Sequence, residues 1–182
     1  MKLDRELSEL DRFVLDFVAA LGKTSYVLVS GYVSILFGRS RSSEDINIII
    51  PVLTKSGFLA LFDVLTAAGF ESITAGRETA HEYISAKTAI QFARKGQVLP
   101  NMEVKFATTY LSQVALKDRI TVELNNRPLF ISPIELQILY KQRCLKSDKD
   151  IEDARHLEIV FERALSAEKL KRYGALIELH GC

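Results

Sequence analysis

The chain has 182 residues, of which 48% are hydrophobic and 26% charged, a composition typical of a folded globular protein. Its net charge of +1 gives no general reason to expect a nucleic-acid or membrane surface. Charged residues interrupt the N-terminal segment 1–21, which excludes a signal peptide or membrane span there. The two cysteines, Cys144 and Cys182, have no metal-ligand spacing and do not suggest a structural disulfide. We therefore expect a reduced, soluble, cytoplasmic protein.

Hydrophobic periodicity predicts alternating helices and strands over the first two thirds of the chain. In chain order, the expected elements are a helix over 3–22, a strand at 25–30, a short helix at 32–38, a strand at 45–50, a helix at 55–68, strands at 70–74, 82–86, 89–94 and 101–107, and a hairpin over 119–132.

The pattern becomes wholly helical at Ser132. The segment "SPIE" reads as a capping box, with serine at the N-cap, proline at the first helical position and glutamate at the third. Helices are expected over 133–146, about 149–165 and 167–180. We predict an α/β domain over 1–131, followed by a helical segment over 132–182 that packs on it.

Polar residues interrupt two of the apolar strands. Side chains two positions apart on a strand share a face, so Asp45 and Asn47 point together, and so do Glu103 and Lys105. Polar groups on buried strands need partners, because an unpaired group costs stability. The simpler interpretation is a satisfied polar pair at a strand end, and the other is a functional site.

The order of small and polar residues around these strands favours a site. The matching residues are Ser30, Gly31, Gly38, Arg41, Ser43, Asp45, Ile46 and Asn47, with Glu103 on a later strand and Lys149, Asp150 and Asp153 after a proline-started helix. This set resembles the nucleotidyltransferase superfamily related to DNA polymerase beta. It is most similar to the minimal members and to the toxin–antitoxin or abortive-infection members. The resemblance covers roughly residues 8–163.

The resemblance implies a mixed sheet flanked by helices, and a site for ATP or another nucleoside triphosphate. It implies that Asp45, Asn47 and Glu103 hold Mg²⁺ or Mn²⁺ and act in catalysis, as carboxylates do in two-metal sites. It implies a nucleotidyl group passing to an acceptor that the motifs do not specify. The residues expected to contact the nucleotide are Ser30, Gly31, Arg39, Arg41, Ser43, Lys105 and Lys141.

Two residues depart from the family pattern. Asn47 stands where the family has a second aspartate, and an amide brings no charge to a hard cation. Lys105 is directed to the same face as Glu103, so the formal charge of the four polar strand residues is −1, against −3 for three unopposed carboxylates. The alternative is therefore an inactive nucleotidyltransferase-fold module in which Lys105 occupies the place of a metal. Such a module would act as a nucleotide sensor or protein-interaction partner.

The helical last third bears on partners. Its apolar positions favour either packing on the chain's own domain or a surface for a homodimer or a helical protein partner. The basic cluster at 169–173 is interpreted as a solvated helix face, with RNA contact as the less favoured interpretation.

Overall fold

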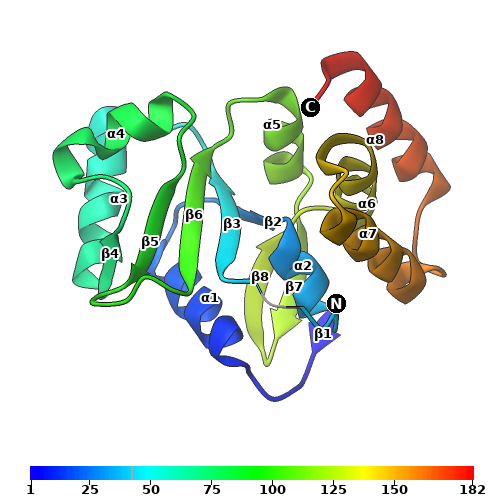
Figure 1. Cartoon of the computed structure of the whole chain (residues 1–182), viewed down its shortest axis with the longest axis horizontal. Helices are drawn as coiled ribbons and strands as arrows, with labels where there is room; N and C mark the ends of the chain where they lie inside the picture. The colour runs from blue at the N-terminus through cyan, green and yellow to red at the C-terminus, as the bar shows by residue number, and fades with distance from the viewer. Residues whose placement is uncertain (42) are drawn as a thin grey trace.

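The computed structural model describes residues 1–41 and 43–182 and contains an eight-stranded mixed sheet with helices packed around it (Figure 1). The strands are β1 (Lys2–Leu3), β2 (Val27–Val29), β3 (Asp45–Ile50), β4 (Phe70–Ser72), β5 (Ile90–Arg94), β6 (Asn101–Phe106), β7 (Ile120–Leu124) and β8 (Arg127–Ile131). The helices are α1 (Glu9–Ala20), α2 (Gly31–Leu36), α3 (Lys55–Ala67), α4 (Arg77–Ser85), α5 (Tyr110–Lys117), α6 (Ile134–Tyr140), α7 (Asp148–Phe161) and α8 (Ala167–His180), with a π-helical turn η1 (Lys141–Leu145) between α6 and α7.

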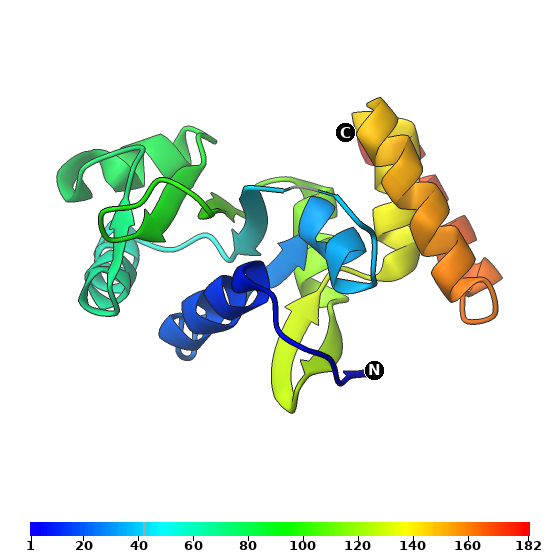
Figure 2. The same cartoon turned by 60° about the horizontal axis from the view of Figure 1, so that its bottom comes forward.

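The strand order is β1-β7-β8-β2-β3-β6-β5-β4, and the sheet mixes parallel and antiparallel pairs. At its centre, β3 runs parallel to β6 and antiparallel to β2. Helices α3 and α4 lie beside β4 and β5 at one end of the molecule, and α6, α7 and α8 gather at the other in both views (Figures 1 and 2). The expected mixed α/β fold is confirmed. Within the described residues, no helix is long and apolar enough to cross a membrane.

The polar start of α1 fixes the position of α2. Asp11 is fully buried and accepts hydrogen bonds from Arg5 at 2.7 and 3.0 Å, from the Ser8 hydroxyl at 2.7 Å and from the Tyr32 hydroxyl at 2.9 Å. Burial alone would raise the pKa of Asp11, but these hydrogen bonds outweigh it and lower the pKa. Burial, together with the Asp11 charge, raises the pKa of Tyr32. The second residue of α2 is thus tied to the first turn of α1.

We predict that acid removes the stabilisation contributed by Asp11. Because its folded-state pKa lies below the unfolded-state value, the contribution is complete above the unfolded-state pKa and is lost as the pH falls through the folded-state pKa. Asp11→Asn should lower the free energy of unfolding by about 1–3 kcal/mol at neutral pH, and by less near about pH 2.5. Urea denaturation at both pH values measures the difference. A deficit that stays the same in acid would contradict the prediction.

The structure differs from the expected elements at three places. The strand expected at 82–86 is wrong, because residues 82–85 belong to helix α4, where Ala80 and Ile84 are buried four residues apart and so share one helical face. Helix α5 was not expected; it begins with a capping box between Thr109 and Ser112. Leu3 pairs with β7 in the short strand β1, so the first helix starts only at Glu9.

The expected capping box at Ser132 is also wrong. Helix α6 starts at Ile134 after Pro133, and its N-cap has no side-chain hydrogen bond. Glu135 instead accepts a hydrogen bond from the backbone N–H of Ser166 at 3.1 Å, which attaches the start of α8 to α6. Glu135, which the sequence pattern placed in a local helix cap, thus makes a tertiary contact.

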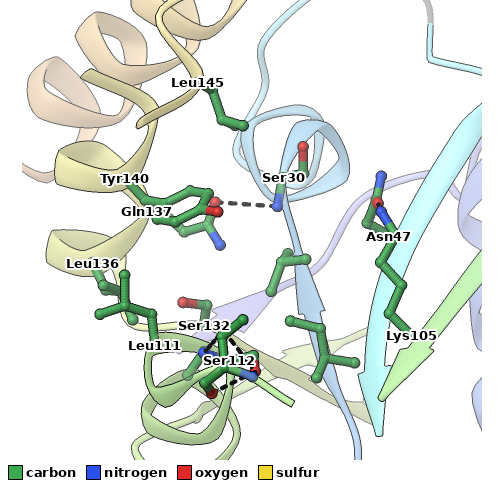
Figure 3. A pocket seen from close by; sticks show the side chains of 14 residues that line it. Ser30, Asn47, Lys105, Leu111, Ser112, Ser132, Leu136, Gln137, Tyr140 and Leu145 are labelled. Carbon is green, nitrogen blue, oxygen red and sulfur yellow. Dashed lines mark hydrogen bonds between the residues drawn. The ribbon is translucent and has the colours of Figure 1, made fainter. Parts of the chain in front are cut away.

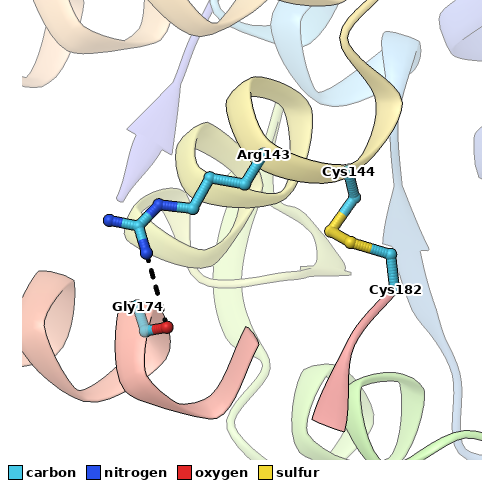
Figure 4. Close-up of a disulfide and its surroundings, with 4 residues drawn as sticks. All are labelled: Arg143, Cys144, Gly174 and Cys182. Carbon is cyan, nitrogen blue, oxygen red and sulfur yellow. Dashed lines mark hydrogen bonds between the residues drawn. A yellow bond between two sulfur atoms is a disulfide. The ribbon is translucent and has the colours of Figure 1, made fainter. Parts of the chain in front are cut away.

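The expectation of two reduced cysteines is contradicted by a disulfide between Cys144 on η1 and Cys182 (Figure 4). The two residues are 38 positions apart in sequence, and α8 brings the end of the chain back to η1. Spacing along the sequence does not reveal such a pairing, because it depends on how two helices pack.

Helix α8 joins two other helical segments. On one side, the Tyr110 ring at the start of α5 stacks on His180 with ring centroids 3.8 Å apart. Asp118, at the end of α5, accepts a hydrogen bond from Tyr173 at 3.1 Å. On the other side, Arg143 of η1 pairs with Glu178 at 2.9 Å, close to the disulfide. Helices α5 and α6 are therefore both fastened to α8.

We predict that the disulfide stabilises the chain. Cys182→Ser should lower the free energy of unfolding by about 3 kcal/mol, because the cross-link restricts a long segment of the unfolded chain. Urea denaturation with and without dithiothreitol measures this loss. The reductant should lower the stability of the wild type to that of the variant and leave the variant unchanged. A wild type that is insensitive to reductant would contradict the prediction.

Candidate functional site

The polar residues of β3 and β6 meet on one face of the sheet. The two strands are parallel neighbours, and their register places Asn47 beside Glu103. Because alternate residues share a face, Asp45 and Lys105 lie on that same face. The expected sharing of a face by Glu103 and Lys105 is confirmed by the contact between their charged groups.

Lys105 forms the centre of this polar group. Its ammonium donates to the amide oxygen of Asn47 at 2.8 Å and to one carboxylate oxygen of Glu103 at 3.2 Å. The other oxygen of Glu103 accepts a hydrogen bond from Gln91 of β5 at 3.2 Å. The ammonium therefore lies between an amide and a carboxylate that the sequence assigned to a metal.

The donor set does not fit two divalent cations. Asp45 is exposed at the start of β3 and accepts a hydrogen bond from the Asn101 amide at 2.5 Å. Both oxygens of Glu103 already have partners, and Asn47 is neutral. Among residues 1–41 and 43–182, no group of three or more histidine, cysteine, aspartate or glutamate residues is placed to hold a metal ion. The assignment of Asp45, Asn47 and Glu103 to a metal stays a prediction.

The turn at Ser30 and Gly31 lies across from these strands. Ser30 has a φ of 65°, and its backbone N–H donates to the side-chain oxygen of Gln137 at 3.2 Å. A Cβ on Gly31 would lie 3.1 Å from the Arg41 guanidinium, tighter than nine in ten real contacts. Glycine at this position thus leaves room for the close approach of Arg41. Ser43 lies near the start of β3, where its hydroxyl donates to the Asp45 carbonyl at 3.1 Å.

The three other cations expected to contact a nucleotide all pair with Asp153, and their contact with a nucleotide stays a prediction. This carboxylate is fully buried and accepts from Arg39 at 2.7 Å, from Arg41 at 2.6 Å and from Lys141 at 2.9 Å. Lys141 is itself only 1% exposed. None of these four residues lines the cavity that lies next to β3 and β6 and is described below. The cluster joins the segment before β3 to η1 and α7.

A cavity of about 220 Å³ lies between the polar strand residues and the helices (Figure 3). Ser30, Asn47 and Lys105 line it from the side of the sheet. Gln137 and Tyr140 of α6 line the opposite side, with Leu145 of η1. Helix α5 closes it with residues that include Leu111 and Ser112. In Figure 3, Asn47 and Lys105 lie side by side and face Tyr140 and Gln137.

Gln137 and Tyr140 are among the lining residues that were not singled out from the sequence. Gln137 and Tyr140 are three positions apart, so they share one face of α6. The signal for Gln137 was a polar residue within the apolar run of α6, where it is only 6% exposed. Tyr140 gave no separate signal, because an aromatic residue in a helical pattern is usually part of the core.

We predict that Asp153 is essential for stability. Asp153→Asn leaves three cations around a neutral amide, and breaking a buried ion pair on one side costs about 3–5 kcal/mol. Urea denaturation measures the free energy of unfolding. Glu152→Gln is the control, because Glu152 pairs with Arg39 alone and its side chain is 59% exposed, so its loss should cost at most about 1 kcal/mol. Equal losses in the two variants would contradict the prediction.

Comparison with known proteins identifies the fold. No protein-family model matches the sequence, and no curated protein matches it. Among solved structures, an antigenic nucleotidyltransferase-like protein from Paracoccidioides brasiliensis matches with a TM-score of 0.54 and 19% identity, over 95% of this chain and 90% of that chain. ANT(2")-Ia in complex with adenylyl-2"-tobramycin matches with a TM-score of 0.60 and 12% identity, over 96% and 100%. The lincosamide antibiotic adenylyltransferase LnuA, bound to lincomycin, matches with a TM-score of 0.56 and 13% identity, over 86% and 99%. The chain has the fold of the nucleotidyltransferase superfamily.

Proposed function

We propose that the chain binds a nucleoside triphosphate in the cavity between the central strands and α6. The observation that carries this proposal is the position of Lys105, which lies between Asn47 and Glu103 and lines the cavity. An ammonium is a compact point charge that suits phosphate oxygens. Tyr140 offers an aromatic ring on the opposite wall, a surface suited to stacking against a nucleobase.

Lys105 supplies positive charge that divalent cations bring to a two-metal site. Its single charge offsets the charge of Glu103, and two of its three N–H groups are used by Asn47 and Glu103. The third N–H is left for a ligand in the cavity. We therefore expect nucleotide binding to be independent of Mg²⁺, as in a nucleotide sensor or regulatory module.

The second candidate function is metal-dependent nucleotidyl transfer to an acceptor. Asp45 favours it, because it is exposed and lies on the same face as Glu103 on adjacent strands. Two of the similar structures are described with an adenylylated antibiotic or a bound antibiotic, which is consistent with a small-molecule acceptor. This function requires Lys105 to leave Glu103, so that the carboxylate is free to bind a cation.

We predict that Lys105→Met weakens binding of a non-hydrolysable ATP analogue by about 10-fold or more, because it removes a hydrogen-bonding charge from the cavity. Isothermal titration with Mg²⁺, and again with a chelator, measures the affinity. The wild type should bind equally well in both conditions.

Lys95→Met is the matched control for this titration, because Lys95 is exposed and lines neither cavity. It should bind the analogue as the wild type does. Binding by the wild type that is lost on chelation would refute the metal-independent proposal and favour the transferase. No binding in either condition would refute the proposed function.

A further inference from the structure

A second cavity of about 220 Å³ adjoins the first. The two share Lys105, Thr109 and Tyr140 among their lining residues, so a ligand in one lies next to a ligand in the other. The second cavity extends toward the end of α4, where Lys87 and Thr88 line it. The proposed nucleotide site therefore has a second cavity directly beside it.

The described residues that line the second cavity carry positive charge and no carboxylate. Lys87 and Lys105 are its charged members. The charge of Lys105 is offset by Glu103, and its one remaining N–H is the donor proposed for the nucleotide. Within residues 1–41 and 43–182, the side chains of Lys87, Thr88 and Thr108 have no ion-pair or hydrogen-bond partner. The cavity thus offers the unpaired ammonium of Lys87 and two hydroxyls to a ligand rich in acceptor oxygens.

The backbone of Lys87 is a second observation about this cavity. Lys87 follows the end of α4 with a φ of 66°, held by its N–H bond to the Ile84 carbonyl at 3.1 Å. The next N–H, of Thr88, bonds to the Tyr83 carbonyl at 3.0 Å. Glycine is the residue that most often takes this left-handed position after a helix, because a side chain there is unfavourable. A lysine at this place costs stability relative to glycine while directing its charge to the cavity.

We propose that the second cavity binds the phosphate group of a second ligand, beside the nucleotide. A phosphate monoester has three terminal oxygens, so it can accept from the Lys87 ammonium and from the hydroxyls of Thr88 and Thr108 together. A carboxylate has two oxygens and would leave part of this donor set unpaired. A cationic second ligand is disfavoured by the charge of Lys87. The position beside the nucleotide rests on the proposed function, whereas phosphate binding by the cavity does not.

The test is a titration of inorganic phosphate into the full chain. Isothermal calorimetry measures the affinity, and changes in amide chemical shifts locate the binding site. Lys87→Gly should weaken phosphate binding by about 10-fold, because it removes the charged donor of this cavity that no carboxylate pairs. The substitution should leave the thermal midpoint equal to or above that of the wild type, because glycine suits the positive φ. Loss of binding in this variant would therefore not be explained by unfolding.

Lys146→Gly is the matched control. Lys146 is also an exposed lysine with a positive φ, 59°, at the end of a helical turn, and it lines neither cavity. The proposal expects this variant to bind phosphate as the wild type does. Equal weakening in both variants would show a general charge effect and would overturn the proposal.

Two further outcomes overturn the proposal as well. One is the absence of phosphate binding by the wild type, and the other is tighter binding of acetate than of phosphate. Titration of the ATP analogue into the unmodified chain tests the proposed function separately. If the analogue fails to bind while phosphate binding depends on Lys87, the nucleotide proposal fails and the phosphate site remains.

Discussion

The arrangement of this molecule depends on the pairing of the buried Asp153 carboxylate with three cations. It receives Arg39 and Arg41 from the segment before β3, and Lys141 from η1. Removing so many charges from water is costly unless each is paired. The pairing therefore requires that the helical segment and the segment before β3 meet in one relative position. Arg41 also lies against Gly31, so the same cluster sets the place of the turn that borders the cavity.

The proposed function places a second constraint within the cavity, where the ammonium of Lys105 would take the place of the charge of bound metal ions. Lys105 is held on β6 and is always present, whereas a divalent cation must be recruited from solution. An ammonium in this position supports fewer kinds of reaction than a metal ion does. One ammonium can neutralise and orient a phosphate, but it does not activate an attacking group as a metal does. Under the proposed function, the site is ready to bind without a metal and lacks the metal's catalytic power.

The sequence predicted those features that follow from local pattern. The faces of Asp45, Asn47, Glu103 and Lys105 followed from strand alternation, and the nucleotidyltransferase fold followed from the order of the motifs. Features that depend on tertiary packing were not predicted. Cys144 meets its partner only because α8 folds back, and Glu135 acts at a distance and not as a cap. Arg39, Arg41 and Lys141 were assigned to the nucleotide because the sequence reveals their charge. It also offered Asp153, but not the burial of this acid or its pairing with all three cations.

The attachment of α8 on both sides has a consequence for motion. The stacking of Tyr110 on His180 fastens α5 to α8, and the disulfide from Cys144 fastens η1 to the end of α8. Two walls of the cavity are thus parts of one rigid unit and do not separate from each other. Widening of the cavity then requires bending where this unit joins the sheet, at residues 107–109, 118–119 and 132–133.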